Sequence, residues 1–179
     1  MKVHKTPVHG VKLIDLEPHL DGRGIFAEAF VANTWAREGL DFYVFQVNLS
    51  KSDKVGTVRG MHWQAPPAAQ GKIVYAVSGR VYDAVVDVRK DSGTYGMSFG
   101  VELGPQSNAL FVPKGVAHGY QALSEGATLM YLVDAPYSPA HERGLRYDDV
   151  EAGIQWPVPA VNVAPKDLRW PTFRGLDRG

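Results

Sequence analysis

The chain has 179 residues, of which 45% are hydrophobic and 21% are charged, as is typical of a soluble globular protein. Nineteen basic residues balance nineteen acidic ones, which argues against broad binding to nucleic acid or to a membrane surface. The absence of cysteine excludes disulfides, thiolate metal sites and a cysteine nucleophile. The N-terminus lacks the apolar core of a signal peptide, and no apolar run approaches the length of a membrane span. We therefore expect a cytoplasmic enzyme or binding module.

Short strand-like runs separated by glycine and proline occupy most of the chain. The predicted strands are Val11–Leu16, Tyr43–Leu49, Thr57–Gln64, Lys72–Val77, Arg80–Val88, Met97–Leu103, Ala109–Val112, Gly119–Leu123 and Thr128–Val133. The fourth and fifth are predicted to pair as a hairpin across Ser78-Gly79. Only Thr34–Glu38 has the pattern of a helix, with Asn33 or Thr34 as its cap. This spacing predicts an all-β sandwich, jelly roll or barrel, formed by a single domain over residues 1–179 whose tail, from about 157 to 179, packs on the surface.

The run Arg59-Gly60-Met61-His62-Trp63-Gln64 and the later Lys72 place an imidazole and an ammonium on predicted strands. Side chains of a strand alternate between faces, so His62 and Gln64 should share one face and Arg59 should lie on the other. A histidine base and a nearby cation suit removal of a proton next to a carbonyl, because the cation stabilises the enolate oxygen. From this segment alone, a surface strand with an unrelated His and Lys is an equal alternative.

Asp83 and His118 are two further polar groups in apolar surroundings. Asp83 shares a strand face with Val81 and Val85, which predicts that it points into the interior. A buried carboxylate needs a partner, and His118 is a natural one. The alternative is a polar core contact without a chemical role.

Two spacings resemble the cupin motifs. Pro113-x-Gly115-x-x-His118 has the pattern of the second motif, and Gly60-x-His62-x-Gln64 has the pattern of the first with its second histidine replaced by glutamine. Lys72 stands near the position of the motif's glutamate. Divalent metals prefer imidazole and carboxylate ligands, so a cation there predicts a pocket with no metal and no cofactor.

Together these residues resemble the dTDP-4-dehydrorhamnose 3,5-epimerase family, which are metal-free cupins that epimerise nucleotide-linked 4-keto sugars. The similarity extends from Gly10 to about Asp167. It is carried by Asp21-Gly22-Arg23-Gly24-Ile25-Phe26-Ala27-Glu28, Arg59 to Gln64, Gln70-Gly71-Lys72-Ile73-Val74, Asp87-Val88-Arg89-Lys90, Pro113 to Gly119 and Ala164-Pro165-Lys166-Asp167. The resemblance implies a cupin-type double-stranded β-helix, that is, a jelly-roll barrel, with short peripheral helices.

The resemblance also implies roles for single residues. His62 matches the general base that removes the proton from carbon 3, and from carbon 5 in full 3,5-epimerases. Asp167 matches the carboxylate that orients this histidine, and Lys72 matches the cation beside the C4 oxygen. Tyr131 matches the acid that returns a proton from the opposite face. His118, supported by Asp83, matches a histidine that contacts the substrate.

Tyr137 matches an aromatic residue that lies against the nucleotide. A further set matches positions that hold the nucleotide diphosphate and base: Arg23, Glu28, Gln46, Asn48, Arg59, Glu142 and Lys166. For each of them, a solvated or salt-bridged surface residue is the alternative. The family forms homodimers in which N-terminal strands cross to the partner, so Arg23 and Glu28 are expected to serve the neighbouring subunit's site.

The chain departs from the family pattern at Val47, Leu49 and Pro136. These departures suggest conserved chemistry with altered selectivity, such as inversion at carbon 3 only or a different nucleotide-linked sugar. Three alternatives remain open: a cupin 3,4-ketoisomerase, a non-catalytic barrel that binds nucleotide sugars, and a metal-dependent cupin oxygenase. The matches at Lys72, Tyr131 and Asp167 favour the epimerase over the isomerase. The intact His62 and Tyr131 count against the binding barrel, and Gln64 and Lys72 predict an empty metal site.

Overall fold

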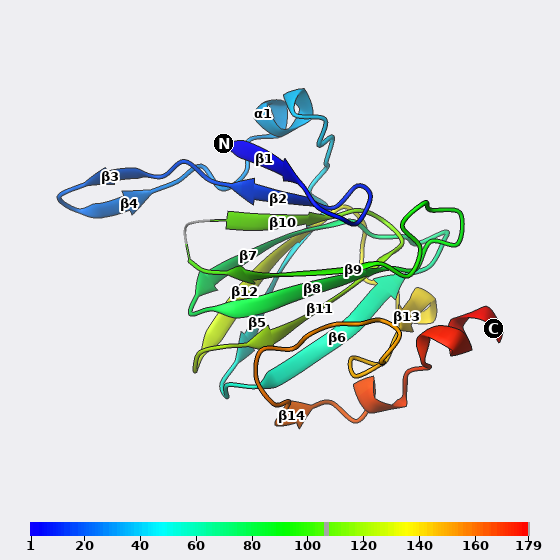
Figure 1. Cartoon of the computed structure of the whole chain (residues 1–179). Coiled ribbons are helices and arrows are strands. Elements are labelled where there is room, and N and C mark those ends of the chain that lie inside the picture. Colours follow the sequence, from blue (N-terminus) through cyan, green and yellow to red (C-terminus); the bar gives the residue numbers. More distant parts are fainter. Residues whose placement is uncertain (106–107, 179) are drawn as a thin grey trace.

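The computed structural model describes residues 1–105 and 108–178 and shows two β-sheets packed face to face (Figure 1). Helices in the described residues are short and peripheral: α1 (Ala32–Arg37) and the 3-10 helices η1 (Pro139–His141), η2 (Asp167–Arg169) and η3 (Phe173–Arg178). The predicted all-β jelly roll is confirmed. The predicted cap of α1 is wrong, because the helix begins one residue before Asn33 and its N-cap is Val31. Gly179, the last residue of the predicted C-terminal tail, lies outside the described residues.

The first sheet has six strands, and all neighbouring strands in it are antiparallel. In spatial order they are β1 (Lys2–Lys5), β2 (Lys12–Asp15), β10 (Asn108–Val112), β7 (Lys72–Ser78), β12 (Ala127–Val133) and β5 (Gln46–Ser52). Their order in space differs from their order in the chain, as expected for a jelly roll in which the chain passes repeatedly between two sheets.

The second sheet contains β13 (Glu142–Gly144), β6 (Thr57–Gln64), β11 (Val116–Ala122), β8 (Val81–Asp87) and β9 (Ser98–Leu103), with β14 (Asn162–Val163) parallel to β6. The predicted hairpin between β7 and β8 is therefore wrong. The two strands lie in different sheets, and the chain crosses between the sheets at Gly79, whose φ is +69°. A glycine turn pattern reports a change of direction, but it does not report which strand becomes the neighbour.

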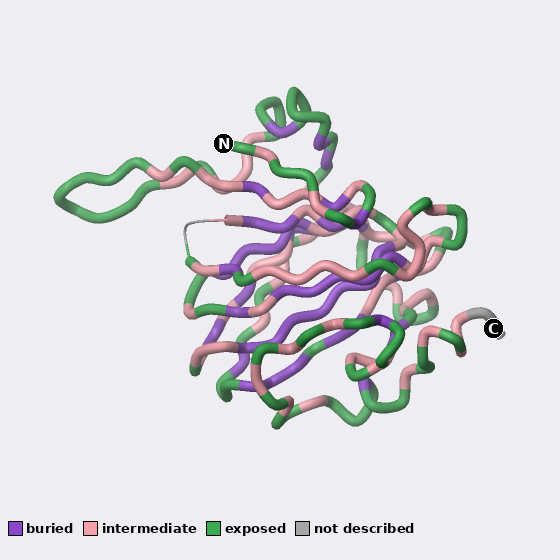
Figure 2. The backbone as a smooth tube through the Cα atoms, viewed as in Figure 1, coloured by how far each residue is buried: buried purple, intermediate pink, exposed green. Residues whose placement is uncertain are grey.

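The interior between the sheets is a continuous apolar core. Val74 and Leu129 of the first sheet pack with Val85 and Tyr120 of the second, and all four are fully buried. Figure 2 shows that the buried residues concentrate along the strands of both sheets. Two smaller apolar clusters cover the outer faces, one around Trp35 near α1 and one under the C-terminal segment.

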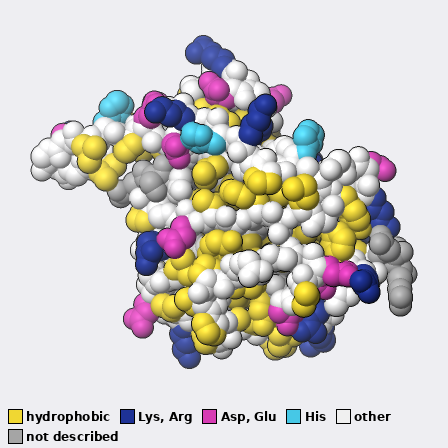
Figure 3. Space-filling model, in the orientation of Figure 1, with side chains coloured by type: hydrophobic (Ala, Val, Ile, Leu, Met, Phe, Trp, Pro, Cys, Tyr) yellow, Lys and Arg dark blue, Asp and Glu magenta, His cyan; other side chains and the backbone are white. Residues whose placement is uncertain are grey.

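The hairpin of β3 (His19–Asp21) and β4 (Gly24–Phe26) projects away from both sheets (Figure 1). It carries apolar side chains into solvent, with Leu20 75% and Phe26 66% exposed. Figure 3 shows hydrophobic side chains along this projection. No helix among the described residues has the length and apolar character needed to span a membrane.

Candidate active site

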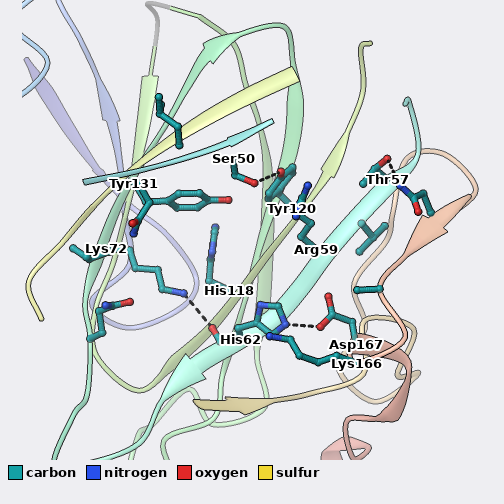
Figure 4. Close-up of a pocket in the computed structure, with 17 residues that line it drawn as sticks. Ser50, Thr57, Arg59, His62, Lys72, His118, Tyr120, Tyr131, Lys166 and Asp167 are labelled. Carbon is teal, nitrogen blue, oxygen red and sulfur yellow. Dashed lines mark hydrogen bonds and ion pairs between the residues drawn. The ribbon is translucent and has the colours of Figure 1, made fainter. Parts of the chain in front are cut away.

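A cavity of about 530 Å³ opens between the sheets. Side chains of both sheets and of the C-terminal segment line it: Asn48, Leu49, Ser50, Thr57, Val58, Arg59, His62, Gln70, Lys72, His118, Tyr120, Tyr131, Val133, Asn162, Ala164, Lys166 and Asp167. Figure 4 shows Tyr131 entering the cavity from one side and His62 from the other. The four residues predicted to be catalytic are thus brought together from separate parts of the chain.

His62 and Asp167 form a hydrogen-bonded pair at the wall of the cavity. The distance between His62 Nε2 and Asp167 Oδ1 is 2.7 Å, and the backbone N–H of Gly60 donates to Asp167 Oδ2 at 3.3 Å. Burial acts to raise the pKa of Asp167, but the hydrogen bond and charge of His62 outweigh it and lower that pKa overall. An ionised carboxylate only accepts hydrogen bonds, so His62 Nε2 carries a proton, and in the neutral form of the ring Nδ1 keeps its lone pair.

An irregularity in β6 brings Arg59 into the same cavity as His62. In the pairing of β6 with β11, His62 lies opposite His118 and Arg59 lies opposite Tyr120, so β6 holds one extra residue between these points. Gly60 occupies the irregularity with φ of +137°, a conformation that side-chain-bearing residues rarely adopt. The prediction that Arg59 and His62 face opposite ways is therefore wrong, because regular alternation stops at this bulge.

Lys72 and Tyr131 enter the cavity from neighbouring strands of the first sheet. Lys72 Nζ donates to the backbone carbonyl oxygen of His62 at 3.3 Å. Burial lowers the pKa of Lys72 to about 8, although the charges of Asp83 and Glu142 partly oppose the shift. Burial, with smaller contributions from Tyr120 and Asp83, raises the pKa of Tyr131 well above its ordinary value. At neutral pH the cavity therefore presents an ammonium and a protonated phenol.

The predicted contact between Asp83 and His118 is present. His118 Nε2 lies 2.9 Å from each carboxylate oxygen of Asp83, and Asp83 is fully buried. Burial lowers the pKa of His118 despite the opposing effect of Asp83, so the ring is mainly neutral at neutral pH. The His118 ring also meets the edge of Tyr131, with centroids 5.9 Å apart. The Asp83–His118 pair therefore forms part of the cavity wall next to Tyr131.

Sequence reasoning missed a cluster of hydroxyl groups in the cavity. The Tyr120 hydroxyl lies 3.0 Å from Ser50 Oγ and 2.9 Å from Ser52 Oγ, and Arg59 Nε donates to Ser52 Oγ at 3.3 Å. Strand periodicity contained a signal for it, because Ser50 and Ser52 share a face with Asn48, and Tyr120 shares one with His118.

The predicted nucleotide-binding residues fall into three groups. Asn48, Arg59 and Lys166 line the cavity. Gln46, Tyr137 and Glu142 are connected to those residues: Gln46 Nε2 donates to Asn48 Oδ1 at 2.6 Å, and Glu142 pairs with Lys166 at 2.7 Å and accepts from the Tyr137 hydroxyl at 3.1 Å. Arg23 and Glu28 do not line the cavity of their own chain. Arg23 is on the projecting hairpin, where its 91% exposed side chain contacts Asp21.

The departures from the family pattern differ in where they lie. Val47 is 53% exposed and does not line the cavity, whereas Leu49 is 70% exposed and reaches the cavity only at its rim. The carbonyl oxygen of Pro136 accepts a hydrogen bond from Gln64 Nε2 at 3.1 Å. Of these three positions, only Leu49 is placed to contact a ligand inside the cavity of its own chain.

The side chain of Gln64 connects two loops by hydrogen bonds, one loop at Ala68 and the other at Pro136 and Ser138. Its Nε2 also donates to the Ala68 carbonyl oxygen at 2.7 Å, and its Oε1 accepts from the Ser138 N–H at 2.7 Å. In the described part of the chain, no group of three or more His, Cys, Asp and Glu residues is arranged to hold a metal ion.

Comparisons with known proteins agree with this geometry. The family model for dTDP-4-dehydrorhamnose 3,5-epimerase matches residues 5–175. A dTDP-4-dehydrorhamnose 3,5-epimerase of Sinorhizobium fredii is 44% identical over 165 residues, covering 91% of this chain and 85% of the relative. A dTDP-4-dehydrorhamnose 3-epimerase of Streptomyces niveus is 37% identical, covering 93% and 81%.

A solved structure from Legionella pneumophila is also similar. This dTDP-6-deoxy-D-glucose-3,5-epimerase, in complex with dTDP-4-keto-L-rhamnose, is 34% identical and superposes with a TM-score of 0.91 over 97% of this chain and 93% of that one. The family match covers nearly the whole chain, including every residue of the predicted site. The chain therefore belongs to the dTDP-4-dehydrorhamnose 3,5-epimerase family and is an isomerase.

Proposed function

We propose that this chain epimerises a nucleotide-linked 4-keto-6-deoxy sugar by exchanging protons on opposite faces of the carbon next to the ketone. The observation that carries the proposal is the placement of two complementary groups on opposing walls of one cavity. The His62–Asp167 pair offers a lone pair on the second sheet, and Tyr131 offers a protonated phenol on the first. Inversion of a carbon needs both a base and an acid on opposite sides.

In this mechanism, His62 Nδ1 removes the proton from carbon 3. The carbon–hydrogen bond breaks, its electrons form a double bond to carbon 4, and the carbonyl oxygen becomes an enolate. The Lys72 ammonium stabilises that oxygen. Tyr131 then donates its phenolic proton to the opposite face of carbon 3, which restores the ketone with inverted configuration. Solvent returns a proton to the phenolate and removes one from the imidazolium, so the enzyme is regenerated.

Asp167 makes the base effective. Its carboxylate fixes the tautomer of His62 and stabilises the imidazolium that forms on proton removal, which is the role of the carboxylate in other base–carboxylate pairs. Its lowered pKa keeps the carboxylate ionised at neutral pH.

The proposed substrate is dTDP-4-dehydro-6-deoxyglucose. The relatives support it, because the Sinorhizobium and Streptomyces proteins are named for dTDP-linked 4-keto sugars and the Legionella structure holds one. Arg59 and Lys166 at the cavity wall suit the charge of a diphosphate. Asn48 also lines the cavity and accepts a hydrogen bond from Gln46, while Tyr137 is connected to Lys166 through Glu142.

Incubation of the enzyme with candidate 4-keto sugars in deuterated water tests the proposal. Deuterium at carbons 3 and 5, followed by a product of inverted configuration at both, supports the 3,5-epimerase. Deuterium at carbon 3 alone identifies a 3-epimerase, the second candidate, which Leu49 at the rim and the Streptomyces relative favour. Migration of the carbonyl identifies a 3,4-ketoisomerase. No exchange with any candidate contradicts the proposal.

We also propose a homodimer in which the N-terminal strands cross to the partner. The exposed apolar side chains of the β3–β4 hairpin support it, as does the separation of Arg23 from the cavity of its own chain. Sedimentation equilibrium tests the dimer. Mixing an Arg23→Ala variant with a His62→Asn variant tests the shared site, because only mixed dimers would then contain one intact site. A cytoplasmic location remains a prediction, which fractionation of the source cells would check.

A further inference from the structure

The structure places an indole ring against the proposed base, on the side away from the cavity lining. Trp170 meets His62 edge to face, with ring centroids 6.3 Å apart and an interplanar angle of 69°. None of the motifs that identified the site includes Trp170. We propose that Trp170 is a positioning residue, admitted by Gly144, which fixes the His62 imidazole against rotation and shields its bond to Asp167 from water. The inference rests on the proposed function.

One turn of chain presents both groups to His62. Asp167 begins the 3-10 helix η2, and Trp170 follows its last residue, three positions after Asp167. Side chains three residues apart are eclipsed in a 3-10 turn, so the carboxylate and the indole leave it on the same side. The Arg146 N–H donates to the Pro171 carbonyl oxygen at 3.0 Å and anchors the chain just after the indole. The two contacts of His62 are therefore coupled through a single short segment.

Gly144 provides the space for the indole. In the pairing of β13 with β6, Gly144 lies directly opposite His62, so a side chain there would share its face. A Cβ atom built on Gly144 would lie 2.3 to 2.4 Å from Trp170 ring atoms. Any side chain at position 144 must therefore displace the indole from His62 or shift the strand.

Packing, rather than a hydrogen bond, holds the indole in place. The Trp170 Nε1 atom is buried and has no hydrogen-bond partner among the described residues. Rotation of a histidine ring about χ2 has a low energy barrier, so a single hydrogen bond at Nε2 still allows the ring to rotate over a range of angles. A second contact at right angles to that bond restricts this rotation and keeps Nδ1 aimed into the cavity. Misplacement of a catalytic group by about 1 Å costs on the order of a hundredfold in rate.

The test compares truncation of Trp170 with truncation of a matched tryptophan. Trp156 is also partly buried, and it packs on the outer face of the second sheet, where its Nε1 donates to the Tyr147 carbonyl oxygen at 2.8 Å. We expect Trp170→Ala to lower kcat for exchange at carbon 3 by about tenfold to a hundredfold, with KM within about twofold. Trp170→Phe should recover most of that loss, and Trp156→Ala should lower Tm without lowering kcat. Wild-type kcat in Trp170→Ala, or equal losses in both alanine variants, would overturn the inference.

The Gly144→Ala substitution provides an independent test of the proposal. Gly144→Ala should lower kcat in the wild-type background by displacing the indole, but it should lower kcat little further when Trp170 is already alanine. An equal loss of kcat in the two backgrounds would show that Gly144 does not act through Trp170, contrary to the inference.

A spectroscopic measurement separates this inference from the proposed function. The proton on His62 Nε2 should exchange with water faster in Trp170→Ala than in the wild type, as read by NMR of the imidazole. This result does not depend on turnover. An enzyme with no exchange activity would overturn the proposed function alone, whereas unchanged protection of the Nε2 proton in Trp170→Ala would overturn the positioning role alone.

Discussion

The pH dependence of the reaction should report the protonation of Lys72. Burial lowers the pKa of this ammonium to about 8, so a lysine that is ordinarily charged well above pH 9 here titrates close to neutrality. The cation that stabilises the enolate is present below that pKa and is lost as the pH rises through it. From a pKa of about 8, roughly nine-tenths of the enzyme is charged at pH 7 and roughly one-tenth at pH 9. We therefore expect kcat/KM to fall about tenfold between these pH values.

Tyr131 and His118 should not contribute to this decline of activity at high pH. The pKa of Tyr131 lies well above 10, and that of His118 is lowered from 6.5, so neither titrates near pH 8. The assay is deuterium incorporation into the 4-keto sugar from pH 6 to pH 10. The profile of kcat should fall at a higher pH than that of kcat/KM, because the bound diphosphate favours the charged ammonium.

Lys72→Arg is the matched variant, because a guanidinium stays charged throughout this range. Its remaining activity, even if low, should show no decline between pH 7 and pH 9. A flat kcat/KM profile of the wild type up to pH 9.5, or an unchanged decline in Lys72→Arg, would refute the reasoning.

Three further outcomes are expected. Asp167→Asn should lower kcat by about 10² to 10⁴ with little change in KM, since it removes the charge that holds the His62 tautomer; steady-state kinetics with a few-fold effect would count against the pair. Tyr131→Phe should keep proton removal but lose inversion, so deuterium exchange would continue while chiral product analysis finds none of the epimer; unimpaired inversion would mean that another acid serves. Gly60→Ala should lower Tm sharply or prevent folding, because φ is +137° and the added Cβ would lie 2.5 Å from the Cα atom of Gly119. Gly22→Ala is the control and should be tolerated, because there is open space around Gly22. Equal Tm values for the two variants would contradict the role given to the bulge.

Local patterns in the sequence predict most of the strands, whereas the residues of the candidate site come together in the prediction only through the family resemblance. The strand Thr57–Gln64 was placed with its observed bounds, and Asp83 was placed in the interior from its apolar neighbours on one strand face. His62 and Asp167 were joined only by the family resemblance. They are 105 positions apart in the chain, and no spacing rule links them.

The errors at Arg59 and Gly79 share a physical cause, because local periodicity does not determine how distant strands pair. Arg59 was assigned to the wrong face because the bulge at Gly60 depends on its close approach to β11. The hairpin across Gly79 was wrong because the choice of sheet is made by partners far along the chain. The contact of Trp170 with His62 is not predicted from the sequence, because it depends on the packing of η2 against β6.

The most direct test of the account is deuterium incorporation at carbon 3 of dTDP-4-dehydro-6-deoxyglucose, measured side by side for the wild type and His62→Asn. We expect rapid incorporation by the wild type and a rate lower by about 10² to 10⁴ in the variant, because a positioned base contributes that much to the rate. Incorporation by His62→Asn at a near-wild-type rate would contradict this expectation.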